Sequence, residues 1–344
     1  MTIEEARRII SVKKSEYGDR LVILGHHYQT DEIIEYADYI GDSLELAKIA
    51  SRIKKADFIV FCGVYFMAET ASIVASGKEV YIPDNNAGCP LADMADIEEV
   101  SVAWEHITEI NKSVVPLTYI NSTALTKAFC GRNAGSVCTS GNAEKMFEWA
   151  MARAEKIFFM PDMNLGRNTA RAMGIPDERI VLWDPSKNMG GLDKESILQA
   201  KVILWKGWCP VHWPELNSKD VVSLRTRYPG IKIIVHPESD PETVKNCDAA
   251  ASTAGILRYI ASLKLGEKVA VGTEYNMVSR AAHSYHSLVD IIPLKRVFCE
   301  DMAKITLEKL AVTLSGIGSM DQRVIVPEEI AKDAKKGLVE MLKV

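Results

Sequence analysis

The sequence lacks any run of apolar residues as long as a membrane-spanning helix. Its longest apolar segments have the length of a strand and are interrupted by Asp, Lys or Gly, well short of the roughly 20 residues that a bilayer requires. The first residues form an amphipathic helical pattern, without the apolar core and small-residue cleavage site of a secretory signal. We therefore expect a cytoplasmic protein that does not bind a membrane.

The chain also lacks an excess of positive charge and the paired cysteines of common metal-binding motifs. Its formal net charge of -5 argues against nucleic acid as a partner, because neutralising phosphates requires clustered Lys and Arg. No CxxC pair occurs, so the pattern fits neither a zinc ribbon nor a ferredoxin. The seven cysteines, in a chain with no visible signal, are expected to be reduced thiols rather than disulfides.

What the sequence does contain is a regular alternation of short apolar runs and helical patterns. The runs at 20–25, 114–120 and 232–235 suit strands that are buried on both faces of a parallel sheet. Strands that alternate with helices indicate parallel sheets with helices on both faces. At 344 residues the chain exceeds the size at which one hydrophobic core keeps growing, so several domains are expected.

The order of elements repeats, which predicts an α/β fold of three similar three-layer αβα modules. We expect module boundaries at 1–105, 106–217 and 218–302, with 303–344 as C-terminal helices that close the fold. A pseudo-threefold arrangement with the active site at the central junction is our hypothesis. Near the end of the chain, the pattern predicts a strand over 296–298 and an amphipathic helix over 301–314.

Residues suited to catalysis gather at the expected carboxyl ends of the strands, where open parallel sheets bind ligands. Loops that only face solvent would contain scattered Ser, Asp and Lys, whereas His, Tyr, Asn and Cys predominate here. These residue types serve proton transfer, orientation and metal ligation. In chain order they are His26 and Tyr28, Cys89, Tyr119 and Asn121, Ser140, Asp162 and Asn164, Cys209 and His212, His236 and Glu238, Ser252 and Thr253, Thr273 and Glu274, and Cys299.

The cysteines have an ordinary structural alternative. A single buried cysteine is usually a small core hydrophobe, and we interpret Cys62, Cys130, Cys138 and Cys247 in this way. For the three strand-end cysteines, one in each module, spacing alone leaves both packing and a shared metal open. If the modules share a centre, three thiolates would meet there and leave one coordination position free.

Taken together, the ordered motifs resemble those of the quinolinate synthase family, the iron–sulfur enzymes of NAD biosynthesis, over nearly the whole chain. The resemblance implies three α/β modules around a pseudo-threefold axis. It also implies the condensation of iminoaspartate with dihydroxyacetone phosphate to quinolinate, with loss of phosphate and two waters. The segments that carry it are LGHHYQTDEI, YIGDSLELA, FCGVYFMAETA, IPDNNAGCPLADM, TYINSTA, VCTSGNA, MPDMNLGR, WKGWCPVH, VHPES, ASTAGI, VGTE and FCEDMAKITLEKL.

The same resemblance assigns roles to residues. It implies a [4Fe–4S] cluster with three ligands, Cys89, Cys209 and Cys299, whose fourth iron stays open to substrate as a Lewis acid. The catalytic residues it implies are Tyr28, His26, Glu238 and Tyr119. The substrate-binding residues it implies are His26, Ser43, Tyr119, Asn121, Ser140, His236, Glu238, Ser252 and Thr253.

The chain departs from the family pattern at a few places. His27 stands where the family usually has Asn, and Ala251 stands where it usually has Gly. Residues 174–199 resemble an insertion ahead of Cys209.

Two functions stand as alternatives to quinolinate synthesis: another [4Fe–4S] hydro-lyase acting on a small carboxylic acid, and a cluster-containing sensor without turnover. We also expect functional coupling to the enzyme that makes iminoaspartate.

Overall fold

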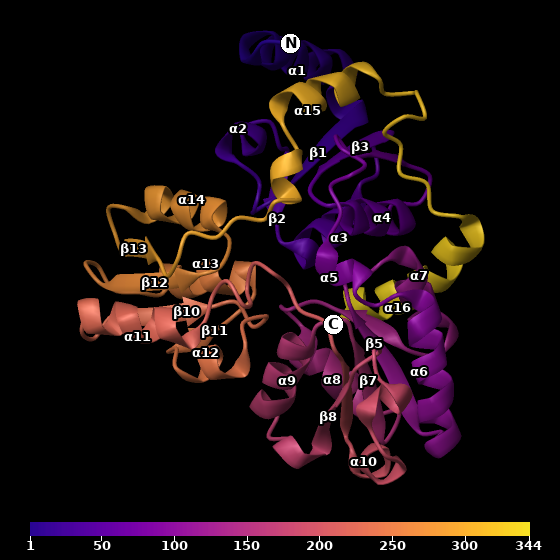
Figure 1. Ribbon diagram of the computed structural model, residues 1–344. Coiled ribbons are helices and arrows are strands. Elements are labelled where there is room, and N and C mark those ends of the chain that lie inside the picture. Colours follow the sequence, from indigo (N-terminus) through magenta and orange to yellow (C-terminus); the bar gives the residue numbers. More distant parts are fainter.

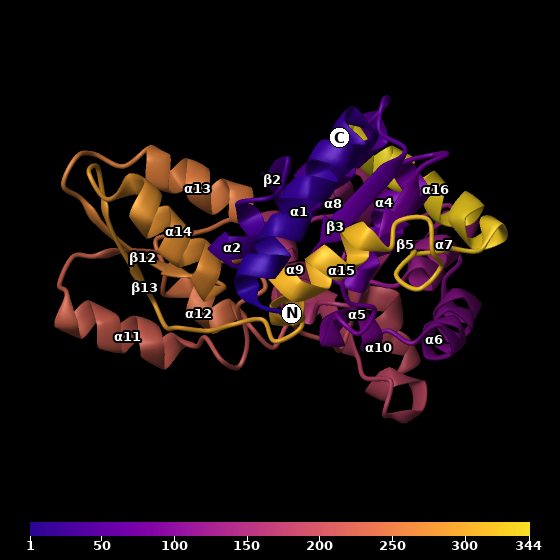
Figure 2. The same ribbon diagram turned by 90° about the horizontal axis from the view of Figure 1, so that it is seen from above.

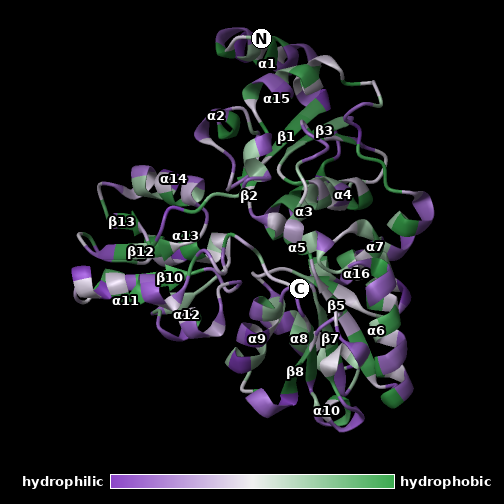
Figure 3. Ribbon diagram, in the orientation of Figure 1, coloured by the Kyte–Doolittle hydropathy of each residue, from purple (hydrophilic) through white to green (hydrophobic).

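The computed structural model describes residues 1–344 and contains three parallel β-sheets, each flanked by helices (Figure 1). The three bodies surround a common centre, and the predicted set of three αβα modules is confirmed. Apolar residues concentrate in the strands, while the outer faces of the helices are polar (Figure 3). None of the helices combines the length and the apolar character that crossing a membrane would need.

The first sheet has the strand order β2-β1-β3-β4 with all neighbours parallel. The sequence pattern after Asp31 is helical, and it does not predict the short edge strand β2. The strands are β1 (Leu21–His26), β2 (Tyr39–Gly41), β3 (Phe58–Cys62) and β4 (Glu79–Tyr81), and the helices are α1 (Ile3–Tyr17), α2 (Asp31–Ile34), α3 (Ser43–Arg52), α4 (Tyr65–Val74) and α5 (Pro90–Asp93).

The second sheet has the order β6-β5-β7-β9-β8 and is also parallel throughout. Its extra edge strand β8 comes from the segment 174–199, so this segment extends the sheet at the edge beyond β9. The strands are β5 (Val114–Tyr119), β6 (Ser136–Cys138), β7 (Lys156–Met160), β8 (Ile180–Trp183) and β9 (Val202–Trp205), and the helices are α6 (Ile97–Ile110), α7 (Ala124–Arg132), α8 (Ala143–Met151), α9 (Met163–Ala172) and α10 (Lys194–Gln199).

The third sheet repeats the order of the first, β11-β10-β12-β13. The strand predicted over 296–298 is wrong. The last strand of this sheet is β13, which pairs in parallel with β12, and Phe298 is exposed in the loop that follows it. The strands are β10 (Lys232–Val235), β11 (Ala249–Ala250), β12 (Lys268–Gly272) and β13 (Asp290–Pro293), and the helices are α11 (Ser218–Arg227), α12 (Pro241–Lys245), α13 (Thr253–Ala261) and α14 (Tyr275–Tyr285).

The C-terminal segment contains α15 (Leu307–Ser315) and α16 (Glu328–Lys343). The single helix predicted over 301–314 is interrupted: a short 3-10 helix covers Met302–Lys304, Ile305 is extended, and α15 starts where the Thr306 hydroxyl accepts the Lys309 N–H. Helix α15 packs against α1, and α16 packs against α7 and β6 (Figure 2). The last helices therefore tie the first module to the second.

The hydrophobic core is not divided equally among the modules. One cluster of 56 buried residues runs through the first module, the second module and the C-terminal helices. The third module has a cluster of 10 buried residues of its own, and a cluster of 9 joins it to Val211 and Leu216 of the second module. The boundary expected between residues 105 and 106 falls within α6, the helix that leads into the second sheet.

Polar contacts attach the third module to the other two. The Arg280 guanidinium donates to the Asp31 carboxylate at 2.7 Å and to the His27 carbonyl at 2.9 Å. On the other side, the Asn168 amide donates to the carbonyls of Pro237 and Ser239, both at 2.8 Å. These contacts hold the loops that follow β1 and β10, and both loops carry residues of the candidate site.

Candidate active site

A cavity of about 550 Å³ lies where the three modules meet. Each module contributes the residues at the end of its first strand, two positions apart: His26 and Tyr28, Tyr119 and Asn121, and His236 and Glu238. Each also contributes one cysteine in the loop after the last strand of the shared order. The expected site residues that line the cavity are His26, Tyr28, Ser43, Cys89, Tyr119, Asn121, Ser140, Cys209, His236, Glu238, Thr253 and Cys299.

Among the residues to which the family resemblance gave a role, Ser252 is the one that does not line this cavity. The strand-end residues Asp162, Asn164, Thr273 and Glu274 do not line it either. The Ser252 hydroxyl accepts the Gly255 N–H at 3.2 Å and caps α13, which brings the neighbouring Thr253 into the wall of the cavity. Ser43 begins α3, whose N-cap is Asp42. The loops at the strand ends therefore start helices and present site residues at the same time.

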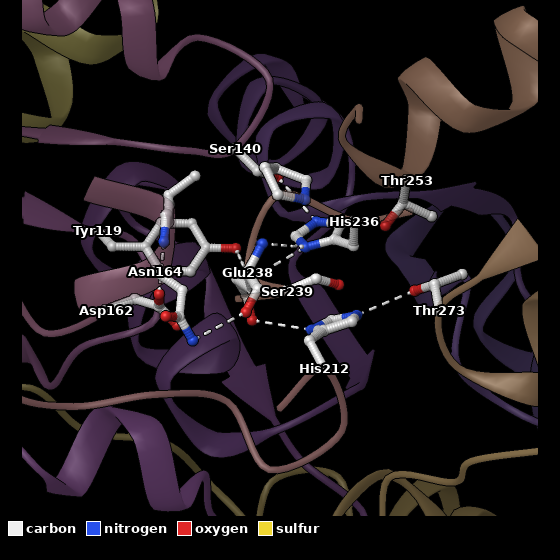
Figure 4. Close-up of polar contacts among 12 residues, drawn as sticks. Tyr119, Ser140, Asp162, Asn164, His212, His236, Glu238, Ser239, Thr253 and Thr273 are labelled. Atoms are coloured by element: carbon white, nitrogen blue, oxygen red, sulfur yellow. Dashed lines mark hydrogen bonds and ion pairs between the residues drawn. The ribbon is translucent and has the colours of Figure 1, made fainter. Parts of the chain in front are cut away.

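A continuous chain of hydrogen bonds crosses the cavity wall. The Tyr28 hydroxyl lies 2.8 Å from the Thr273 hydroxyl, which lies 3.0 Å from Nε2 of His212. Nδ1 of His212 lies 3.0 Å from one oxygen of Glu238, and the Tyr119 hydroxyl donates to the other oxygen at 2.5 Å (Figure 4). These contacts join side chains from all three modules.

The partners of His212 assign its tautomer. An ionised carboxylate only accepts hydrogen bonds, so Nδ1–H donates to Glu238 and Nε2 is left to accept from the Thr273 hydroxyl. The Thr273 oxygen then accepts from the Tyr28 phenol. Every donor in the chain points toward Glu238, and this polarity suits the movement of a proton from Tyr28 to His212.

Glu238 is 2% exposed and is still held in its ionised form. Burial opposes ionisation and is the largest single effect, but the adjacent imidazoles of His236 and His212 and the hydrogen bonds from His212 and Tyr119 outweigh it, so the pKa of Glu238 lies below its usual value. Tyr119 has a raised pKa, because it is buried and faces this negative charge. Tyr119 therefore remains a hydrogen-bond donor.

The two other histidines of the site are buried and neutral. Burial, reinforced by repulsion from His212, lowers the pKa of His236 to about 3, and its ring stacks on that of His212 at 4.4 Å. Nε2 of His236 lies 3.2 Å from the Ser140 hydroxyl. Burial also lowers the pKa of His26, whose Nδ1 accepts the Tyr28 N–H at 3.1 Å. Tyr28 itself has a raised pKa, from burial first and then from the charge of Glu238.

Three thiols line the same cavity, and they suit a metal centre. Burial raises the pKa of Cys89, Cys209 and Cys299, the last to about 11. The thiols reinforce this effect, since Cys299 raises the pKa of Cys89, and both raise that of Cys209. Without a cation the group would stay protonated, whereas a bound metal stabilises thiolates. The donor set therefore fits a thiolate-ligated iron centre.

The remaining cysteines lie elsewhere. Cys62, Cys130 and Cys138 are buried, Cys247 is half-buried in the third module, and none of them lines the cavity. The ligand atoms of Cys209, His212 and Glu238 also lie within 4.8 Å of one another. Both ring nitrogens of His212 already have hydrogen-bond partners in Glu238 and Thr273, so its geometry favours a place in the hydrogen-bond chain over metal ligation.

His212 and Thr273 are the main residues to which the sequence assigned no role. In the sequence, the only signals for them are that both stand among the strand-end residues and that His212 follows Cys209 by three positions. Asp162 and Asn164 also belong to the surroundings: Asp162 caps α9, and the Asn164 amide donates to the Glu238 carbonyl at 3.3 Å (Figure 4). The side-chain oxygen of Asn121 is buried beside the cavity without a hydrogen-bond partner, which leaves it free for a ligand.

Comparison with known proteins agrees with this geometry. The family model described as Quinolinate synthetase A protein matches residues 7–343. The chain belongs to the quinolinate synthase family. It is 44% identical to the quinolinate synthase of Anoxybacillus flavithermus over 99% of this chain and 94% of that protein. It is 46% identical to that of Halalkalibacterium halodurans over 91% and 86% of the two chains, and 41% identical to that of Corynebacterium glutamicum over 99% and 88%.

Membership in the quinolinate synthase family makes the chain an enzyme of NAD biosynthesis. The family implies an iron–sulfur cluster and substrates related to quinolinate synthesis. The cavity at the junction of the three modules is the place in this chain that combines thiols with groups for proton transfer.

Proposed function

We propose that the chain condenses iminoaspartate with dihydroxyacetone phosphate to give quinolinate, phosphate and two waters, at a [4Fe–4S] cluster held by Cys89, Cys209 and Cys299. The observation that carries this proposal is the cavity wall itself, where one thiol from each module lies beside the hydrogen-bond chain that ends at Glu238. When bound, the cluster would supply an iron without a thiolate ligand, which acts as a Lewis acid in dehydration.

The residues of the chain supply the proton transfers that two dehydrations require. The raised pKa of Tyr28 makes its phenol a weak acid, so it loses its proton only when a hydrogen-bonded group accepts it. As the phenol passes its proton to the Thr273 oxygen, the Thr273 hydroxyl proton moves to Nε2 of His212, and Glu238 stabilises the imidazolium that forms. The phenolate oxygen is then a base beside the substrate, and the reverse transfer makes it an acid. This arrangement uses the logic of a serine–histidine–carboxylate triad.

The polar groups around the cavity suit substrates that carry carboxylates and a phosphate. The hydroxyls of Ser43, Ser140 and Thr253 and the neutral imidazoles of His26 and His236 can donate to anionic oxygens. Ser252 would contribute by capping α13. The Asn121 amide and Tyr119 would line the reacting part of the substrate.

We further propose that the enzyme works in the cytoplasm and couples to the enzyme that makes iminoaspartate, since this imine is unstable in water. The module boundaries at 105, 217 and 302 are part of the same proposal. They assign one of the three cysteines to each module, with the C-terminal helices as a common brace.

The test is anaerobic reconstitution of the full chain with iron and sulfide, followed by an assay with iminoaspartate and dihydroxyacetone phosphate. We expect about four irons per chain and formation of quinolinate. Cys209→Ala should lose both, while Cys247→Ala, which lies outside the cavity, should keep both. A wild-type chain that binds no iron with all three thiols reduced would disprove the proposal.

A further inference from the structure

Lys127 is a lysine with no exposed surface that takes no part in the hydrogen-bond chain and does not line the cavity. It lies in the first turn of α7, directly after the loop that joins Tyr119, at the end of β5, to α7 and carries Asn121. Long charged side chains are almost never fully buried unless they are paired. Its position therefore calls for a partner.

Local structure does not explain this lysine. The first turn of a helix is its positive end, which disfavours a cation. The ammonium group has three donors, yet its one hydrogen-bond acceptor is the Ser122 carbonyl, and it forms no ion pair within 4.0 Å. Glu69 is the carboxylate whose charge acts on it, and that carboxylate accepts the Ala124 N–H at 3.1 Å. An ammonium so weakly compensated is costly to bury.

The surroundings of Lys127 lead to the proposed cluster. Its Nζ lies 5.3 Å from the centre of the Phe66 ring, and Phe66 lines the cavity. Next to Phe66, the Tyr65 N–H donates to the Ala87 carbonyl at 2.7 Å, in the loop that carries Cys89. Burial lowers the pKa of Lys127 to about 8, and Glu69 and Cys89 both act to raise it. The ammonium is therefore charged at pH 7, and the Phe66 ring lies between it and the cavity that Cys89 also lines.

Lys127 also stabilises the loop in front of its helix. The Ser122 carbonyl that it binds belongs to a tight turn, in which the Ser122 hydroxyl donates to the Tyr119 carbonyl at 2.8 Å. Tyr119 contacts Glu238, and Asn121 leaves its side-chain oxygen free at the cavity. One buried ammonium thus contacts the turn between Tyr119 and α7 and lies behind Phe66, in the wall of the cavity that Cys89 also lines.

We propose that Lys127 is a positioning residue of the iron–sulfur centre, whose buried positive charge offsets the negative charge of the centre on the Cys89 side and fixes the loop of Tyr119 and Asn121. Three thiolates outweigh the charge of an oxidised [4Fe–4S] core, so the loaded centre is the anion that this ammonium lacks. The inference rests on the proposed function.

The decisive measurement is the midpoint reduction potential of the cluster, from anaerobic titration of the reconstituted full chain at pH 7. Lys127→Gln keeps a donor for the Ser122 carbonyl but removes the charge, so we expect a more negative potential, since net charge near a cluster sets its potential. Lys127→Arg keeps the charge and should restore the wild-type potential. The matched control is Lys156→Gln, a buried lysine of the same module whose Nζ binds the carbonyls of Leu198 and Ala200 at 2.6 and 2.8 Å.

Glu69→Gln provides an independent measurement if Lys127→Gln does not retain its cluster. Removing the carboxylate that offsets the ammonium should move the potential in the positive direction. An unchanged potential in Glu69→Gln, or in a fully loaded Lys127→Gln, would overturn the inference while leaving the proposed function intact. Absence of iron from the wild-type chain would instead count against the proposed function.

Discussion

Replacing Glu238 by Gln tests the centre of the proposed mechanism with a change of one atom. The amide is nearly isosteric with the carboxylate but has one acceptor oxygen where Glu238 has two. The carboxylate accepts from Tyr119 at 2.5 Å and from Nδ1 of His212 at 3.0 Å. Its substitute can satisfy one of these donors, and its own NH2 group then faces the other.

The size of the effect follows from the bond that is lost. A hydrogen bond to a charged group contributes about 1.5–3 kcal/mol, and each 1.36 kcal/mol of barrier corresponds to a factor of ten in rate. The loss of the charge that stabilises the His212 imidazolium acts on the transition state. We therefore expect Glu238→Gln to lower kcat about 10- to 100-fold while KM changes little.

The assay is quinolinate formation under anaerobic conditions, with iron and sulfide measured on the same samples. Glu215→Gln is the matched control, because Glu215 also lines the cavity but is exposed and paired with Lys295 at 3.1 Å. This control should retain the wild-type rate. A fully loaded Glu238→Gln enzyme with wild-type kcat would refute the mechanism, and it would favour a cluster protein that does not use this carboxylate.

Three further outcomes follow from the structure. Thr273→Val removes the hydroxyl between Tyr28 and His212 without changing the shape of the side chain, so kcat should fall about 10- to 100-fold at unchanged iron content. A wild-type rate would exclude proton transfer along the hydrogen-bond chain. Burial lowers the pKa of His236 from 6.5 to about 3, so its contribution to stability is full above pH 6.5 and falls by about 1.4 kcal/mol per pH unit below it. Denaturant unfolding between pH 7 and 5 should therefore show that the unfolding free energy of His236→Asn depends less steeply on pH than that of the wild type. Equal dependence on pH would contradict this. Gly131→Ala would place a methyl group 2.0 Å from the Asp333 carbonyl of α16, so the unfolding free energy should fall by about 1–3 kcal/mol, and an unchanged Tm would show that α16 can shift freely.

The sequence predicted the parts of the site that depend on local pattern. Continuous apolar runs located β1, β5 and β10 closely, and the polar residues at their ends line the cavity as expected, because parallel strands direct their carboxyl ends to one side of a sheet. His236 and Glu238 illustrate the point. Their spacing of two positions at the end of β10 is repeated by His26 and Tyr28 at the end of β1.

The rest depends on contacts between modules, which no local pattern encodes. His212 and Glu238 are separated by 26 residues in the sequence, and their hydrogen bond exists only because the second and third modules pack together. The strand predicted over 296–298 is absent because the preceding segment, β13, is the one that pairs with β12, and residues 296–298 lie in the loop that follows it. In both cases tertiary packing decides what the sequence pattern leaves open.

The way the buried apolar residues are divided among the modules explains why the hydrogen-bond chain from Tyr28 to Glu238 depends on the position of the third module. Tyr28 and Tyr119 belong to the first two modules, which share one continuous apolar core. Thr273 and Glu238 belong to the third module, whose small clusters lie apart from that core, and polar contacts such as those of Arg280 help to attach this module. Hydrogen bonds weaken within a few tenths of an ångström, so a movement of the third module by about 1 Å would separate Tyr28 from Thr273 and Tyr119 from Glu238 together. The contacts that seat this module are therefore part of the catalytic geometry, although they touch no substrate.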